Sequence, residues 1–213
     1  MRSSGWMFGL VLAAHAAGSE APLEITVQLF NSASVPQSEI RRAEREAGWM
    51  FQTAGIAVHW VECPALQRER GGDQVCKESD DSRLFVVSIN AVDPPEQSDT
   101  ALGFALIHGR SNHAAAVYPR IVAQTEHDSD YQDCVLLGSV MAHELAHLLF
   151  RSTRHGEGIM RANWTRRDYQ AMAHRRLTFT AEQAQTLRKM LAKRSEGEAR
   201  QAGPTSTEAT VRP

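Results

Sequence analysis

A long apolar segment near the middle of the chain is the feature that most constrains its fold. Apolar side chains occupy nearly every side of a helix between Val135 and Met141. Such a helix has no face for solvent, so other elements must cover it on several sides. No apolar run in the chain reaches the roughly 18–20 residues of a membrane span. We therefore predict that residues 131–150 form a helix through the middle of a folded domain.

Upstream of this helix, the sequence has the patterns of several strands and one amphipathic helix. Residues 23–30 alternate apolar and polar side chains, which indicates a strand. Apolar residues then recur every three or four positions after Pro36, which predicts a helix to Thr53 with Gly55 as its C-terminal cap. The remaining patterns predict strands over residues 56–61, 83–90, 101–107 and 114–122.

Downstream, the sequence indicates two shorter helices and a polar tail. One helix is expected over residues 165–175 and the other over residues 180–194, where Thr180 and Gln183 can form a capping box. Residues 195–213 carry Gly, Pro, Ser and Thr without apolar content, which predicts disorder.

The order of these elements predicts one α+β domain over residues 19–194. We expect a mixed β-sheet with an N-terminal packing helix and a central helix at 131–150. Residues 151–194 would form a small helical C-terminal subdomain.

The charge of the chain argues against nucleic-acid binding. The 23 Lys and Arg residues against 25 Asp and Glu residues give a net charge of −2. A dedicated nucleic-acid binder usually carries a strong basic excess. Charge is nevertheless segregated, because residues 62–100 are mainly acidic and residues 151–194 mainly basic. We interpret these segments as solvated faces rather than docking surfaces.

The first 18 residues have the features of a secretory signal peptide. Arg2 and the amino terminus supply positive charge, residues 6–14 are apolar, and small residues around Ala16 offer a cleavage site. We therefore expect the protein to be secreted or periplasmic.

Export makes the three cysteines interpretable, because disulfides form in oxidising compartments. Cys63 and Cys76 flank a polar, turn-rich loop, and a disulfide between them would contribute about 3 kcal/mol on the chain-entropy model. Cys134 is then left over, and we interpret it as a small buried side chain. Pairing of Cys134 with either of the other two cysteines remains an open alternative.

The chemistry of the chain is concentrated in the HELAH segment inside the central helix. His143 and His147 are four residues apart, so their imidazoles project from one face of a helix and can reach one ion. Neutral imidazole suits Zn²⁺. Glu144 is rotated by about 100° from His143 on a helix, so it can take a proton from water instead of binding the metal. A third candidate ligand, His155, follows soon afterwards.

The longer string HELAHLLFRSTRHGEGIM, residues 143–160, resembles the zinc-binding segment of metzincin metalloproteases. The resemblance implies a zincin-like fold in which residues 131–150 form the active-site helix. It implies Zn²⁺ bound by His143, His147 and His155, with Glu144 as the general base. Met160 would form the methionine turn beneath the metal.

Two positions depart from the metzincin pattern. The third histidine comes eight residues after the second instead of six, and Phe150 replaces the glycine at which the family's helix ends. We expect the two extra residues to let the chain reverse without a left-handed position that favours glycine. Asp168 is the main alternative to His155 as third ligand, and Glu157 and Glu182 are further carboxylates to weigh.

These features together predict a secreted zinc-dependent endopeptidase that acts as a monomer on peptide or protein substrates, without nucleic acid and without a membrane span. The alternative is a non-catalytic zinc-binding or cell-envelope interaction protein on the same scaffold.

Overall fold

A computed structural model describes residues 23–64, 76, 81–92, 100–107, 112–126 and 132–201. The expected signal peptide and residues 202–213 of the expected disordered tail lie outside the described residues, so these two predictions stay untested.

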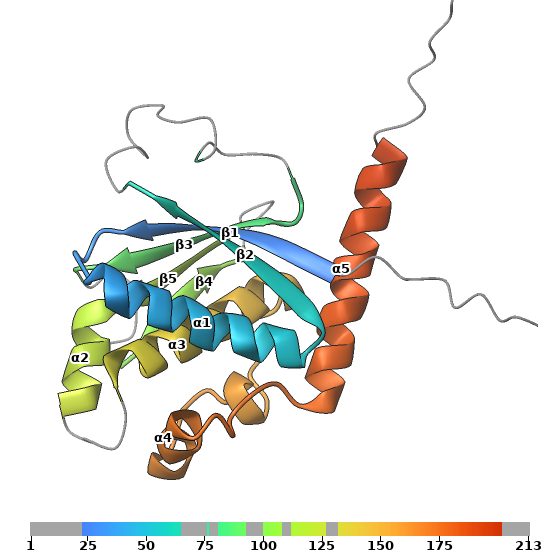
Figure 1. The fold of residues 1–213 in the computed structure, drawn as a ribbon. Helices are drawn as coiled ribbons and strands as arrows, with labels where there is room; N and C mark the ends of the chain where they lie inside the picture. Colours follow the sequence, from blue (N-terminus) through green and yellow to red (C-terminus); the bar gives the residue numbers. More distant parts are fainter. Residues whose placement is uncertain are drawn as a thin grey trace, which may run out of the picture.

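Five strands form a single mixed sheet on which the rest of the domain is built (Figure 1). They are β1 (Leu23–Asn31), β2 (Ile56–Cys63), β3 (Leu84–Asn90), β4 (Gly103–Leu106) and β5 (His113–Val117). The strand order is β2-β1-β3-β5-β4. Neighbouring strands are parallel except for β4, which pairs antiparallel with β5 and forms one edge of the sheet. The expected mixed sheet is therefore confirmed.

Three helices lie on one side of this sheet in Figure 1: α1 (Gln37–Thr53), α2 (Tyr118–Glu126) and α3 (Asp133–Phe150). The packing of α1 on α3 is close, because a Cβ at Gly138 would lie 2.6 Å from the carbonyl oxygen of Ala43. Only glycine therefore fits where these helices meet. The apolar face predicted for α1 is buried and consists of Ile40, Ala43, Ala47, Met50 and Phe51.

Helix α3 runs through the core, as its composition predicts. By length and mean hydropathy (1.3) it is the one described helix that could cross a membrane, yet 83% of it is buried inside the domain. Its apolar side chains are covered by α1, the sheet and the C-terminal elements. A core helix and a membrane span can have the same apolar composition. The packing of α3 inside the domain accounts for its apolar side chains.

The strand expected over residues 114–122 is wrong in its second half. The strand β5 ends at Val117, and helix α2 begins at Tyr118. The β-branched pair Ile121 and Val122 has the composition of a strand, but Pro119 stands in the first turn of the helix, where proline is tolerated. Ile121 is buried in the core, so tertiary packing decides the conformation of this segment.

The C-terminal part consists of the 3₁₀ turn Gly158–Met160, α4 (Arg166–Ala173) and α5 (Ala181–Gln201). Helix α5 continues past residue 194, so residues 195–201 are helical and not part of an irregular tail as the sequence suggested. Glu, Ala, Arg and Gln in this stretch favour helix enough to outweigh Gly197. Arg194 ties α5 to the domain, since its guanidinium donates to the carbonyl oxygens of Ser82 and Leu148, each at 2.8 Å.

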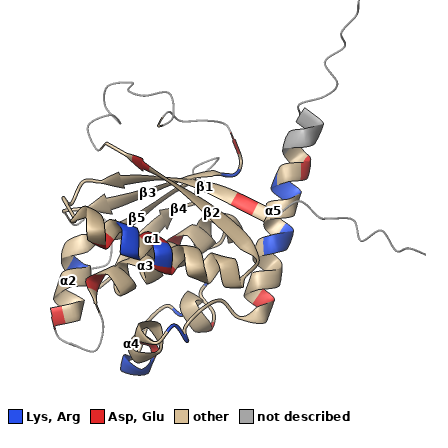
Figure 2. Ribbon diagram, viewed as in Figure 1, with Lys and Arg blue, Asp and Glu red and all other residues tan. Residues whose placement is uncertain are grey.

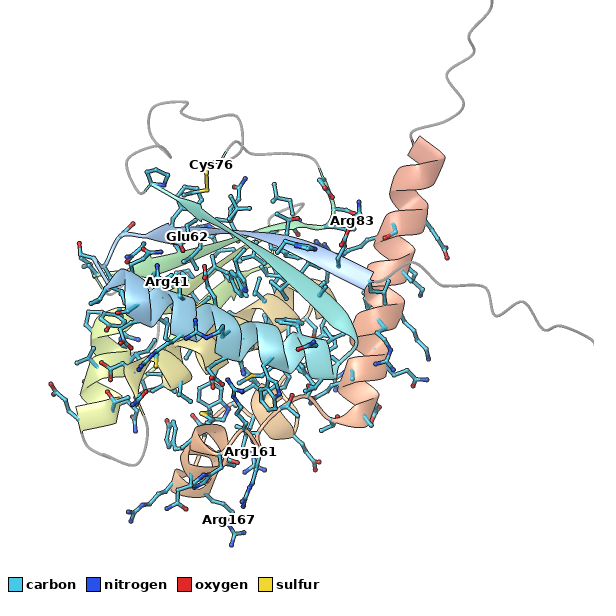
Figure 3. All side chains as sticks on the ribbon, viewed as in Figure 1. Arg41, Glu62, Cys76, Arg83, Arg161 and Arg167 are labelled. Carbon is cyan, nitrogen blue, oxygen red and sulfur yellow. A yellow bond between two sulfur atoms is a disulfide. The ribbon has the colours of Figure 1, made fainter. Side chains whose placement is uncertain are left out.

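The Cys63–Cys76 disulfide expected from the sequence is present (Figure 3), and Cys134 is a free, buried thiol. Burial is the main cause that raises the pKa of the Cys134 thiol. The thiol therefore stays protonated and unreactive, which agrees with a packing role.

Glu44 on α1 is expected to weaken the fold at neutral and alkaline pH. Burial, followed by the nearby charge of Glu62, raises the pKa of its carboxyl to about 7, and its Oε1 is buried without a hydrogen-bond partner. The folded state therefore binds a proton between about pH 4.5 and 7 that the unfolded chain releases, so stability falls as pH rises through this window.

The variant Glu44→Gln removes this penalty. Because Glu44 is only partly buried, we expect the free energy of unfolding of the variant to exceed that of wild type by about 1–2 kcal/mol at pH 8. At pH 4.5 the two values should be equal. Urea unfolding at both pH values measures this, with the exposed Glu182→Gln as control. An equal gain at both pH values would contradict the ionisation argument.

Candidate metal centre

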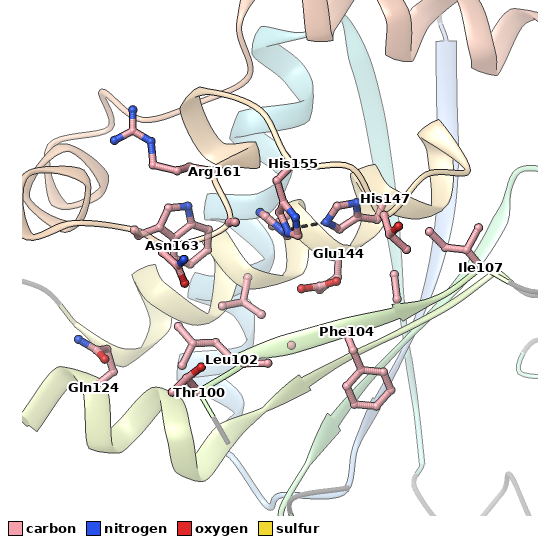
Figure 4. Close-up of a pocket in the computed structure, with 18 of the residues that line it drawn as sticks. Thr100, Leu102, Phe104, Ile107, Gln124, Glu144, His147, His155, Arg161 and Asn163 are labelled. Carbon is pink, nitrogen blue, oxygen red and sulfur yellow. Dashed lines mark hydrogen bonds between the residues drawn. The ribbon is translucent and has the colours of Figure 1, made fainter. Parts of the chain in front are cut away.

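Three imidazoles meet at the C-terminal end of α3 (Figure 4). His143 and His147 lie one helical turn apart, and their Nε2 atoms are 3.0 Å from each other. His155 comes from the segment after the helix, and its ring centre lies 5.3 Å from that of His143 and 4.9 Å from that of His147. One nitrogen from each ring lies within 4.8 Å of the others. The three side chains are therefore placed to hold one metal ion.

The end of α3 turns the chain back toward the histidines. Arg151, directly after the helix, has φ 49° and ψ 45°, and its N–H bonds to carbonyl oxygens of the last turn. The N–H of Ser152 donates to the carbonyl oxygen of His147 at 3.2 Å, which closes the helix end. Our expectation that the longer spacing avoids a left-handed residue is wrong. The reversal still needs one, and Arg151 adopts it one position after Phe150.

The segment that carries His155 is held by the C-terminal subdomain. Gly158 has φ 58°, and a Cβ there would lie 2.5 Å from the carbonyl oxygen of Thr178. The same oxygen accepts from the N–H of Ile159 at 3.1 Å. The Gln183 side chain of α5 donates to the carbonyl oxygen of Glu157 at 2.9 Å. Contacts with residues more than 15 positions away thus set the path of this turn.

Backbone carbonyls orient both helical histidines. The Nδ1–H of His143 donates to Ile159 at 2.8 Å, and the Nδ1–H of His147 donates to Ser152 at 2.7 Å. The Ile159 carbonyl also accepts from the Trp164 indole at 3.2 Å. Such outer partners are the rule for metal-binding histidines. Sequence reasoning missed Ser152 and Ile159, because a backbone oxygen leaves no signature in the residue type, and it missed Trp164, whose indole takes part only through the tertiary contact with Ile159.

These hydrogen bonds decide which ring nitrogens are available. With Nδ1 protonated on both rings, the two neutral imidazoles face each other with unprotonated Nε2 atoms. The lone pairs of the two Nε2 atoms, 3.0 Å apart, repel each other. A cation between the rings would remove the repulsion in this contact, which is drawn as a dashed line in Figure 4. Two nitrogens at Zn–N distances of about 2.0–2.1 Å in a tetrahedral site would be separated by about 3.4 Å, close to this spacing.

A proton is poorly suited to be that cation. Burial, together with the neighbouring His147 and His155, lowers the pKa of His143 to about 4 despite the hydrogen bond to Ile159. Burial is also the main cause that lowers the pKa of His147. Both rings are therefore neutral at physiological pH, which is the form that binds metal ions.

Glu144 lies next to the histidines between α3 and the edge strand β4. A Cβ at Gly103 of β4 would come within 2.9 Å of the Glu144 Cγ and within 2.7 Å of the Val140 Cγ1. The absence of a side chain at position 103 therefore lets the strand lie directly against the carboxyl-bearing turn. Burial raises the pKa of Glu144 to about 8. A cation at the three histidines would favour the ionised form and oppose this shift.

A groove of about 590 Å³ gives access to these groups (Figure 4). One wall is formed by residues 100–107, which include β4, and the other by residues 161–164 after the 3₁₀ turn. The histidines and Glu144 line the groove between these walls. An extended chain could therefore reach the metal ligands along β4, whose outer edge is the end of the sheet.

The structure separates the other candidate ligands from the three histidines. The Oδ2 of Asp168 accepts from the backbone N–H and hydroxyl of Thr165 and from Arg161, and caps α4. Glu157 and Glu182 also lie outside the described group that could hold a metal. The group that could hold a metal therefore contains His155 and not Asp168.

Met160 is buried, 2% exposed, in the 3₁₀ turn that follows His155.

No protein-family model and no curated protein matches the sequence. Solved structures do match the fold. A zinc-dependent peptidase from Methanocorpusculum labreanum (strain Z) superposes with a TM-score of 0.53 at 15% identity, over 76% of this chain and 99% of that one. The fold is similar to that of zinc-dependent peptidases. Archaemetzincin from Methanopyrus kandleri gives a TM-score of 0.50 at 14% identity, over 79% of this chain and 96% of that one.

Proposed function

We propose that this protein is an exported, metzincin-like endopeptidase that depends on zinc. One observation carries the proposal: His143, His147 and His155 converge beside the buried carboxyl of Glu144 in an open groove. Three protein ligands with space for a further one are typical of catalytic zinc sites, whereas structural sites are closed by four protein ligands. The fold, similar to those of zinc-dependent peptidases, supports the same reading.

The donor set fits zinc better than the other common ions. Three neutral imidazoles form a borderline-soft set of nitrogen ligands, whereas Ca²⁺ and Mg²⁺ prefer oxygen. The carbonyl oxygens of Ile159 and Ser152 keep the Nε2 atoms of the two helical ligands unprotonated and directed inward. When bound, zinc acts as a Lewis acid that makes water a better nucleophile and polarises a carbonyl group.

Glu144 would serve as the general base. Its carboxylate accepts a proton from the attacking water and then delivers it to the nitrogen of the departing amine. The position of Glu144 supports this role, because its carboxyl lines the groove beside the three histidines, where a bound cation would favour the ionised form that accepts a proton. Walls on both sides of the groove hold the peptide in line with the carboxylate.

The remaining parts of the proposal concern the surroundings of the site. Met160, buried directly after the segment of His155, would form the floor beneath the ligands. The apolar N-terminal residues and the Cys63–Cys76 disulfide support export to the periplasm or the medium. We expect peptide or protein substrates and a monomeric enzyme.

Metal removal tests the proposal. The mature protein should contain about one zinc ion per chain and should cleave denatured casein or a mixed peptide library. A chelator should abolish cleavage and lower the unfolding temperature, because metal binding stabilises the folded state. Elemental analysis and a peptide assay with added zinc measure both effects. Stoichiometric zinc without any cleavage would support the non-catalytic alternative, and absence of transition metal would contradict the proposed site.

A further inference from the structure

Arg161 lines the same groove as the three histidines and follows directly after Met160. In Figure 4 its side chain lies on the Asn163 side of the histidines, opposite Ile107. Its guanidinium points away from the imidazoles. It therefore lies where a substrate residue some distance from the reacting bond would pass.

Arg161 is held in place at both ends. Its backbone N–H donates to the carbonyl oxygen of Gly158 at 3.2 Å, within the turn that carries the metal-site segment. Its Nη1 donates to the Oδ2 of Asp168 at 3.1 Å. That carboxylate is itself fixed by Thr165, through the backbone N–H at 2.8 Å and the hydroxyl at 2.7 Å. A guanidinium anchored in this way loses little further entropy when it binds a ligand.

The guanidinium can bind a second carboxylate. It has five N–H groups in a planar fork, and the hydrogen bond to Asp168 uses one of them. The Arg161 side chain is 44% exposed, whereas that of Asp168 is 9% exposed. A carboxylate arriving from the groove can therefore accept from the remaining donors in the bidentate geometry that arginine favours.

The two walls of the groove differ in charge. The wall at residues 100–107 has no charged residue. The opposite wall belongs to the segment from Arg151 to Thr180, in which the acidic residues are Glu157 and Asp168. Blue segments, which mark Lys and Arg, lie around α4 in Figure 2. The basic residues of the segment are Arg151, Arg154, Arg161, Arg166, Arg167, Arg175 and Arg176. Among the lining residues that the structure describes, Arg161 is the one lysine or arginine.

We infer that the groove selects peptides that carry a carboxylate, an acidic side chain or a C-terminal carboxylate, bound by Arg161. The inference rests on the proposed peptidase function and names its substrate class. Because Arg161 lies on one side of the histidines, the preference should be confined to one side of the cleaved bond. A favourable field from the neighbouring arginines would also speed the arrival of acidic substrates.

Matched peptides test this inference. Fluorogenic peptides that differ only by Glu or Gln at each of three positions on either side of the cleaved bond are compared by kcat/KM. We expect the zinc-loaded enzyme to prefer Glu by about tenfold at positions on one side, the size of one charge-assisted hydrogen bond. The preference should disappear in Arg161→Gln, and Arg161→Glu should prefer Lys instead. A C-terminal carboxylate is distinguished by amidated peptides, which should be cleaved more slowly if it is the group recognised.

Binding gives a second readout that does not depend on turnover. In the zinc-loaded Glu144→Gln background, a labelled Glu peptide should bind about tenfold more tightly than its Gln counterpart, and Arg161→Gln should remove this difference. The control is Arg167→Gln, an exposed arginine of α4 outside the groove (Figure 3), which should keep the preference.

The outcomes separate the two proposals. Efficient cleavage of Glu and Gln peptides at equal rates would overturn the role of Arg161 and leave the peptidase function intact. A Glu preference that survives in Arg161→Gln, with normal zinc content and unfolding temperature, would overturn it as well. Absence of all cleavage together with tight, Arg161-dependent binding of Glu peptides would reject the peptidase and keep the carboxylate site.

Discussion

Replacing Glu144 with alanine should abolish peptide cleavage and leave the metal in place. Glu144 does not belong to the three-histidine group, so its loss removes no ligand. Removal of a general base lowers rates by roughly 10²–10⁴-fold. Folding should not suffer, because the lost carboxyl is buried with a pKa raised to about 8 and its ionised form is costly in that position. Zinc content, kcat/KM and thermal unfolding of the purified variant measure these three expectations.

Two controls sharpen this experiment. Glu144→Gln keeps the size of the side chain and removes only its ability to exchange a proton, so it should be as inactive as Glu144→Ala. Glu157→Ala removes an exposed carboxylate from the neighbouring turn and should retain wild-type activity. Turnover near the wild-type rate in Glu144→Ala, with zinc bound, would show that another group accepts the proton.

The second large effect is expected at His155. Loss of an outer hydrogen-bond partner alone weakens metal binding by about 10–100-fold, so His155→Ala, which removes a direct ligand, should weaken it by more than about 100-fold. Activity should fall with zinc occupancy and return in part when zinc is added in excess. The domain should stay folded, because His155 is exposed and contributes no core packing. Competition with a zinc-binding dye measures the affinity.

Asp168→Ala is the decisive counterpart. It should keep the zinc affinity and instead destabilise α4 by about 1 kcal/mol, since Asp168 completes a capping box with Thr165. His174→Ala controls for the loss of an imidazole, because His174 is exposed and lies outside the group of three histidines. If Asp168→Ala lost the metal while His155→Ala retained it, the assignment of the third ligand would be wrong.

Most elements were predictable because each has a strong local pattern. The period-two alternation of β1 and the three- and four-residue spacing of α1 agree with the structure to within one residue. The helix α2 was not predictable in this way, because Ile121 and Val122 have the composition of a strand and only their packing makes them helical. The sequence pattern places the end of α5 too early, because residues 195–201 lack apolar side chains although most of them favour helix.

The sequence alone determined the first half of the candidate site. A helix places residues four positions apart on one face, so His143 and His147 had to converge once residues 131–150 were helical. The same local geometry determined that Glu144 lies beside the ligands and does not belong to them.

Only the tertiary structure decided the second half. His155 reaches the other two histidines because Arg151 reverses the chain and Thr178 and Gln183 hold the following turn. The nitrogens that face the metal are selected by the carbonyl oxygens of Ser152 and Ile159. These contacts join backbone groups and distant segments, and neither residue type nor spacing records them. A turn of this length has many possible paths, and packing against the C-terminal subdomain selects one of them.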